Sequence, residues 1–137
     1  MTLKTINKGF TLIELMIVMS IMALLMGLVG PMMMNSLEKA QAKQELLTAK
    51  QWFKKISYRA FSSGEILYLE LKGKKAVLYS KDNNKKNIIH TELMTYVFFQ
   101  PQLMTYNTKG FVFPDRIVGT FKGAPMLIEL NTQVKSN

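Results

Sequence analysis

The residue of this chain with the most unusual surroundings is Glu14, which precedes an almost unbroken apolar run. From Leu15 to Met34 there is no charged residue. A helix of that length rises about 30 Å, which matches the hydrocarbon core of a bilayer. Because a backbone in lipid must satisfy its own hydrogen bonds, we expect this segment to be helical. A carboxylate inside such a helix is costly, so Glu14 is a candidate functional residue.

The segment Lys8–Glu14, with the sequence KGFTLIE, resembles the class III signal of type IV pilins and type II secretion pseudopilins. It combines a short basic leader, a glycine before an aromatic residue, a glutamate five residues after the glycine, and the apolar run. The resemblance implies that a prepilin peptidase cuts between Gly9 and Phe10 and that Phe10 becomes N-methylated. It also implies that Glu14 lies near the N-terminal amine of a neighbouring subunit in a filament.

The resemblance implies a structural role, as a minor pilin or pseudopilin of a type IV pilus or a type II secretion pseudopilus. Its partners would be the prepilin peptidase, other pilins or pseudopilins, and the bacterial inner membrane. Lys4 and Lys8 would stay cytoplasmic by the positive-inside rule, which places the C-terminal domain in the periplasm or outside. The chain has no cysteine, so it lacks the C-terminal disulfide of many major pilins, and this favours a minor subunit.

Physical reasoning agrees with this resemblance. Glu14 is expensive in lipid and much less so beside a neighbour's ammonium group in a dry helical bundle, which would favour transfer from membrane to filament. Two alternatives remain. The chain could be a DNA-binding or adhesive minor pilin, or a membrane-anchored periplasmic accessory protein that never polymerises.

The apolar run contains a candidate helix break at Gly27, Gly30 and Pro31. Proline removes one backbone donor and clashes with the preceding turn, so we expect a kink or local melting there. After Asn35 the pattern becomes amphipathic, with apolar positions alternating at steps of four and three: Ala42, Leu46, Ala49, Phe53, Ile56 and Ala60. This face should pack on a globular domain, with Trp52 beside it.

Past residue 62 the pattern changes to short strand-like runs, which predicts an α+β protein with an antiparallel sheet. Ser62-Ser63-Gly64 should end the helix. We expect strands at 65–71, 76–80, 88–90, 93–99, 110–113, 116–121 and 126–130, with a polar loop at 81–87 and a strand end before Pro101. The predicted organisation is therefore a leader (1–9), a membrane-spanning or filament-core helix (10–34), its amphipathic continuation (35–62) and a β-rich domain (63–137).

No pattern in the sequence predicts catalysis. There is one histidine, His90, and we find neither a nucleophile elbow, a phosphate-binding glycine loop nor a zinc helix. The loop 81–86 has one acid among three lysines and is a poor calcium site. We therefore predict no catalytic residues, no metal site, no cofactor and no enzymatic activity.

Lysines offer the best binding hypothesis outside the N-terminal segment. The formal net charge is +9, and a basic surface attracts polyanions. Six lysines fall in two neighbouring loops of a predicted hairpin region, close in sequence to Tyr68 and Tyr79: Lys72, Lys74, Lys75, Lys81, Lys85 and Lys86. Lysines that neutralise phosphates, with aromatic rings for stacking, are what non-specific nucleic-acid binding requires. DNA or another polyanion is therefore a candidate partner, although lysine-rich hairpin tips are also common as simple solvated turns.

Overall fold

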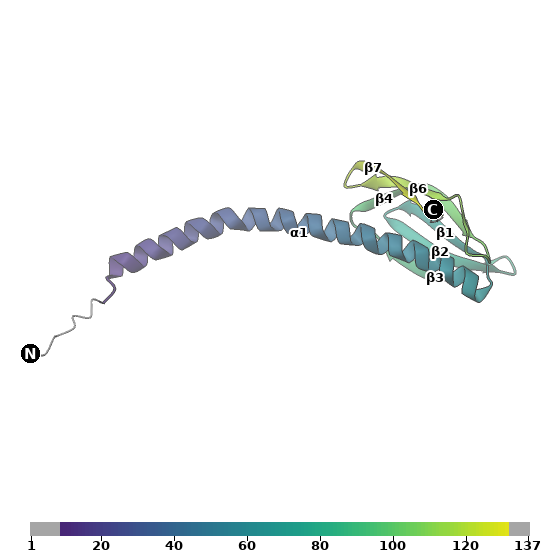
Figure 1. The fold of residues 1–137 in the computed structure, drawn as a ribbon, viewed down its shortest axis with the longest axis horizontal. Helices are drawn as coiled ribbons and strands as arrows, with labels where there is room; N and C mark the ends of the chain where they lie inside the picture. Colours follow the sequence, from purple (N-terminus) through teal and green to yellow (C-terminus); the bar gives the residue numbers. More distant parts are fainter. Residues whose placement is uncertain (1–8, 132–137) are drawn as a thin grey trace, which may run out of the picture. The chain divides into compact units, whose positions relative to one another are not determined.

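A computed structural model describes residues 9–131 and confirms the α+β class: one long helix is followed by an antiparallel sheet of seven strands (Figure 1). The helix α1 spans Leu12–Ser63. The strands are β1 (Leu67–Gly73), β2 (Lys75–Asp82), β3 (Lys85–Leu93), β4 (Val97–Tyr106), β5 (Val112–Phe113), β6 (Arg116–Phe121) and β7 (Ala124–Glu129). The chain divides into two compact units, residues 1–39 and residues 40–137, and each is described by itself.

In the first unit, the described chain is non-helical at residues 9–11 and enters α1 at Leu12. The apolar side chains of this part of α1 are exposed throughout. Gly27 and Gly30 have open space around them, and Pro31 lies inside the helix. The expected local melting is not present, since residues 27–31 are helical. Proline removes only one donor from the helical ladder, which a long helix can tolerate; a break at this position on assembly stays a prediction.

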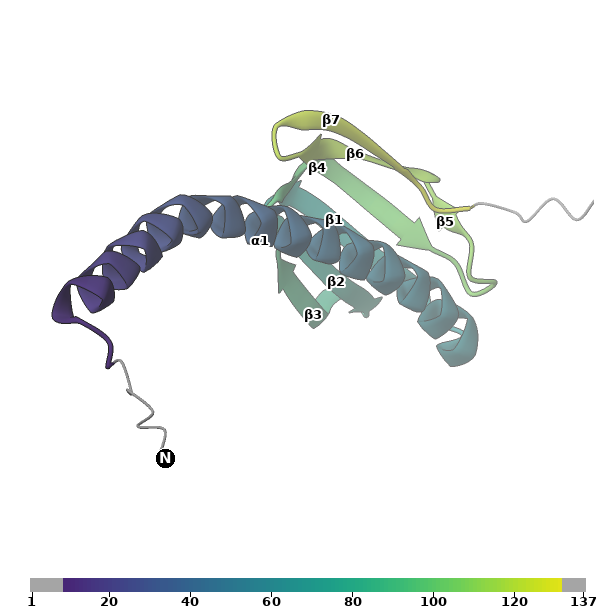
Figure 2. The ribbon, with the colours of Figure 1, turned by 60° about the vertical axis from the view of Figure 1, so that its left-hand side comes forward.

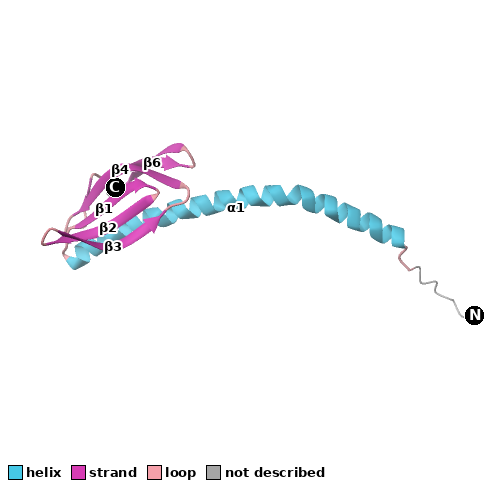
Figure 3. Cartoon of the chain, turned by 180° about the vertical axis from the view of Figure 1, so that it is seen from behind, coloured by secondary structure: helices cyan, strands magenta, loops and turns pink. Residues whose placement is uncertain are grey.

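In the second unit, α1 packs on the sheet through the face that the sequence predicted. Ala42, Ala49, Phe53, Ile56 and Ala60 are buried, while Leu46 and Trp52 are partly buried against the core. Seen from behind, this part of the helix runs along one face of the sheet (Figure 3). The helix ends as expected: Gly64 adopts a φ of 66° and donates its N–H to the carbonyl of Ala60, which is a glycine C-cap.

The strand order is β3-β2-β1-β4-β6-β7, and β5 pairs with β4. β3 and β7 are therefore the two edges of the sheet (Figure 2). Alternation along β1 buries one face under the helix: Leu67, Leu69 and Leu71 are buried, whereas Tyr68 and Glu70 point to the other face. Phe53 of the helix packs edge-on against Phe99 of β4, with ring centroids 6.1 Å apart.

Three expectations about the strands were wrong. The segment 81–87 is not a loop, because β2 and β3 continue into it and meet at a tight turn. Asn83 and Asn84 have φ values of 46° and 63°, and asparagine tolerates this left-handed region. The segment 93–99 is not one strand either: β3 ends at Leu93 and β4 begins at Val97.

Pro101 does not end its strand. It lies within β4 where the register against β1 shifts, between the pairs Leu71–Gln102 and Gly73–Phe99. Residues 99 to 102 on β4 thus oppose the shorter span 71 to 73 on β1. A β-bulge leaves a residue out of the ladder, and it is one of the few places where a sheet accepts proline.

Candidate functional site

The start of α1 is the first candidate site, and its chemistry depends on Thr11 and Glu14. Thr11 precedes the first helical residue. Its N–H donates to Glu14 Oε2 at 2.9 Å, and the Glu14 N–H donates to Thr11 Oγ1 at 3.4 Å. This reciprocal pair is a capping box, which satisfies two of the backbone donors that a helix leaves open at its N-terminus. The negative charge also lies at the positive end of the helix dipole.

Sequence reasoning singled out Glu14 but missed Thr11. The signal was present, because Thr-x-x-Glu directly before an apolar run is the sequence form of a capping box. Within residues 9–131, the N–H of Thr11 is the only donor to the Glu14 carboxylate. One carboxylate oxygen is therefore used inside the chain, and the other is available to a group from outside it.

The Gly9–Phe10 peptide bond lies in the non-helical segment directly before this capping box. The Phe10 side chain is 88% exposed, and an added side chain at Gly9 would meet open space. The bond thus lies outside the hydrogen-bonded helix, where a peptidase can reach it. Its cleavage and the methylation of Phe10 stay predictions.

The apolar part of α1 completes this site. It is long and apolar enough to cross a membrane, and its most apolar stretch is not buried. The hydroxyl group of Ser20 has a partner within the helix, since it donates to the carbonyl of Met16 at 2.8 Å. A surface of this size and composition is stable only in lipid or against other apolar helices. These features are consistent with membrane anchoring.

The lysines named in the sequence form two sets rather than one. Lys72, Lys74 and Lys75 surround the β1–β2 turn, where Lys72 pairs with Lys75. Lys81, Lys85 and Lys86 surround the β2–β3 turn. The two turns lie at opposite ends of β2, whose eight residues span about 25 Å. The six lysines therefore do not form one continuous surface, and their binding of a polyanion stays a prediction.

Two lysines of the second set, Lys81 and Lys86, make contacts within the chain. Tyr68 and Tyr79 stack on the sheet face away from α1, with ring centroids 5.4 Å apart. Lys81 Nζ lies 4.7 Å from the Tyr68 ring centroid, and Lys86 Nζ lies 4.1 Å from that of Tyr79. Lys86 also donates to Glu70 at 2.5 Å, and this bond lowers the pKa of the Glu70 carboxyl. Aromatic rings covered in this way are poorly placed to stack on nucleic-acid bases.

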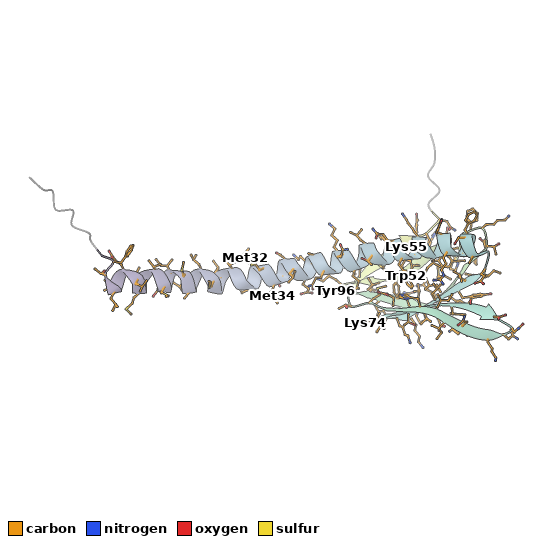
Figure 4. The ribbon with its side chains drawn as sticks, turned by 90° about the horizontal axis from the view of Figure 1, so that it is seen from below. Met32, Met34, Trp52, Lys55, Lys74 and Tyr96 are labelled. Carbon is orange, nitrogen blue, oxygen red and sulfur yellow. The ribbon has the colours of Figure 1, made fainter. Side chains whose placement is uncertain are left out.

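A groove of about 300 Å³ lies between α1 and the end of β3, lined in part by Glu45, Trp52, Lys55 and Glu92. Figure 4 shows Trp52 and Lys55 on the helix at this level. Close to it, His90 Nε2 lies 2.9 Å from Glu92 Oε2, and the Trp52 ring meets the His90 ring edge-on. Within the described chain no three His, Cys, Asp or Glu side chains come together as metal ligands. We find no catalytic arrangement in this groove.

Glu45 is the polar residue that sequence reasoning missed in the second unit. Its carboxylate accepts backbone N–H groups from Thr95 (2.8 Å), Tyr96 (2.8 Å) and Val97 (3.1 Å). These three donors belong to the β3–β4 connection, some fifty positions away in sequence, so no local pattern could have found them. The bond set fixes this connection to the helix and explains why 93–99 is not one strand.

Comparison with known proteins adds one finding. Residues 4–30 match the family model described as the prokaryotic N-terminal methylation motif. This match contains the Gly9–Phe10 bond, the capping box and most of the uncharged run. The curated proteins and the solved structures contain no match to the chain.

Proposed function

We propose that this chain is a structural subunit of a type IV pilus or a type II secretion pseudopilus, because its N-terminal methylation motif supports a type IV pilin-like or pseudopilin-like precursor. It would be cut between Gly9 and Phe10 by a prepilin peptidase and then assemble with other pilins through α1. The observation that carries the proposal is the Thr11–Glu14 capping box at the head of an apolar helix that nothing in the described chain covers.

Assembly would lower the free-energy cost of two charged groups of the inserted subunit, the Glu14 carboxylate and the new N-terminal amine. In lipid, Glu14 has one internal donor, and an ionisable side chain at that depth is expensive. Cleavage before Phe10 creates a free amine in every processed subunit. In a bundle of parallel helices, a neighbour's amine can approach the second carboxylate oxygen of Glu14, which offsets the charge of both groups. The capping box supports this reading because it fixes the position of the carboxylate at the helix end.

The proposal assigns no chemistry to the chain beyond assembly, and the motif itself points to a structural protein rather than an enzyme. The absence of cysteine favours a minor subunit over a major pilin with a disulfide-closed loop. The β-rich domain, whose sheet face away from α1 exposes Phe98, Leu103 and Leu127, would supply contacts that select neighbouring subunits.

The decisive experiment replaces Glu14 with Val and with Gln in cells that carry the prepilin peptidase. Intact mass should show loss of residues 1–9 and one added methyl group in wild type and in both variants. Filament incorporation, measured in sheared and membrane fractions, should fall strongly for Glu14→Val and for Glu14→Gln, because neither side chain carries a negative charge that can offset an ammonium group. Glu65→Gln, an exposed change in the second unit, is the matched control and should assemble normally.

Two results would overturn the proposal. A full-length, unmethylated N-terminus in peptidase-competent cells would mean that the motif is not used. Correct processing with normal distribution of Glu14→Val would leave the chain as a membrane-anchored accessory protein. The DNA-binding alternative now has less support, because the lysines it relied on are divided between two ends of the sheet.

A further inference from the structure

The lysines around the β1–β2 turn belong to a larger basic end of the sheet. Lys74 accepts a hydrogen bond at its carbonyl from the N–H of Met94 (2.7 Å), which joins the β1–β2 turn to the β3–β4 connection. Lys122 donates its N–H to the carbonyl of Tyr96 (3.0 Å), which adds the β6–β7 turn. Lys72, Lys74, Lys75 and Lys122 therefore lie at one end of the sheet, and we call this group the basic end.

The basic end is fixed to an early turn of the helical part of the second unit. Tyr96 donates its hydroxyl to Gln41 (3.3 Å), and Glu45 holds the N–H groups of residues 95–97. Figure 4 shows Lys74 and Tyr96 at the same end of the domain. The uncharged run ends at Met34, so six residues lie between it and Gln41. This connection spans at most about 25 Å even when it is fully extended.

The charge of this end comes from the three lysines of the β1–β2 turn. Of the acids near them, Glu45 has its carboxylate occupied by three backbone donors, and Glu92 contacts His90. Glu70, on the outward sheet face, is bonded to Lys86, which is the main cause of its lowered pKa, and the charges of Lys72 and Lys75 lower that pKa further. Lys72, Lys74 and Lys75 are exposed. The short connection to the apolar run limits how far this positive surface can lie from a bilayer that the run spans, and anionic headgroups attract exposed lysines that come within about 10 Å of them.

We propose that the basic end docks on the anionic phospholipid headgroups of the membrane in which the unassembled subunit is inserted. This inference rests on the proposed function for its membrane topology. Docking would hold the β-rich domain against the bilayer before assembly, and extraction into a filament would require its release. The opposite set, Lys81, Lys85 and Lys86, lies at the far end of β2 and would not reach the same headgroups.

The test uses the full chain in lipid nanodiscs, either of phosphatidylcholine alone or with about one third phosphatidylglycerol. Because the chain has no cysteine, a single fluorophore can be attached at Thr95→Cys at the basic end, or at Thr108→Cys in the β4–β5 connection at the other end. Both residues are exposed. A lipid with a nitroxide headgroup quenches fluorophores that lie close to the surface.

We expect the Thr95 label to be quenched at least twofold more in phosphatidylglycerol discs than in neutral discs, with the difference lost at 0.5 M salt. The Thr108 label should not respond. The variant K72Q/K74Q/K75Q should remove the lipid-dependent difference, since each lysine near an anionic surface changes binding by about fivefold. The matched variant K81Q/K85Q/K86Q should keep it.

Equal quenching of the Thr95 label in both kinds of disc would overturn the proposal, and so would equal loss in the two triple variants. Duplex DNA that binds the same discs and abolishes the lipid-dependent quenching through Lys72, Lys74 and Lys75 would reassign the basic end to nucleic acid. The experiment needs insertion but not polymerisation. Failure of headgroup docking is thus distinguishable from failure of assembly, which the Glu14 variants measure.

Discussion

The contact between Glu45 and the β3–β4 connection predicts a specific loss of stability. In Glu45→Ala the N–H groups of Thr95, Tyr96 and Val97 lose their acceptor. Thr95 is exposed, so water can replace the carboxylate there, whereas the bonds to Tyr96 and Val97 are part-buried. Each part-buried donor left without a charged acceptor costs about 1 to 1.5 kcal/mol. Alanine recovers a few tenths as a better helix former, which leaves a net loss of about 2 kcal/mol.

For a cooperative unit of about 100 residues, that loss lowers the midpoint of thermal unfolding by about 10 °C. The full chain in detergent would be followed by the fluorescence of Trp52, the only tryptophan, which packs against the core. This probe reports on the second unit rather than on the apolar helix. Urea titration on the same samples would give the change in the free energy of unfolding.

Two further variants make the reasoning refutable. Glu45→Gln keeps a carbonyl oxygen for Tyr96 and Val97 but turns an amide donor toward the N–H of Thr95, so its loss should fall between wild type and Glu45→Ala. Glu65→Ala removes an exposed carboxylate and should change stability by less than about 0.5 kcal/mol. If Glu45→Ala and Glu65→Ala have the same unfolding midpoint, Glu45 does not hold the β3–β4 connection.

Three other changes have outcomes that follow from single contacts. Tyr106→Phe should stabilise the second unit by about 0.5 to 1 kcal/mol in urea titration, because the Tyr106 hydroxyl is buried without a hydrogen-bond partner in the described chain; its burial also raises the pKa of the phenol. A lower midpoint for Tyr106→Phe would show that the hydroxyl has a partner. Gly119→Ala should destabilise by about 2 kcal/mol or more, since its new Cβ would come within 2.4 Å of the Phe98 carbonyl oxygen, and an unchanged unfolding midpoint would exclude that close approach. The Glu70 carboxyl should titrate below its usual pKa of 4.5 by NMR and return toward it in Lys86→Gln. Its stabilising contribution is present above that usual pKa and is lost as the pH falls through the lowered value, and the loss should be small because both side chains are about half exposed.

Local and periodic features of the fold could be read from the sequence. The apolar run, the amphipathic face of Ala42, Ala49, Phe53, Ile56 and Ala60, and the glycine cap at Gly64 each depend on residues within a few turns of one another. The α+β class followed from the change of period after residue 62. The capping box of Thr11 and Glu14 is also local, so its pattern was available although only Glu14 was singled out.

What sequence reasoning missed depends on contacts between distant segments. The strand boundary at residues 94–96 is set by Glu45 from the helix, and the acceptance of Pro101 within β4 depends on a bulge against β1. The strands on either side of Asn83 and Asn84 were missed because this polar, lysine-rich segment has no apolar alternation. Backbone pairing between β2 and β3 nevertheless extends through it as far as Asp82 and Lys85.

The candidate sites divide in the same way. The sequence by itself determined the N-terminal methylation motif, because the predicted cleavage and methylation and the capping box all concern residues of one short segment. Only the tertiary structure decided which lysines lie at the same end of the sheet. Antiparallel pairing sends neighbouring turns to opposite ends of β2, and the pairing of β6 with β4 brings Lys122 to the same end of the sheet as Lys74 from almost fifty residues away. Proximity along the chain is a poor guide to proximity in a sheet, because each strand reverses the direction of the one before it.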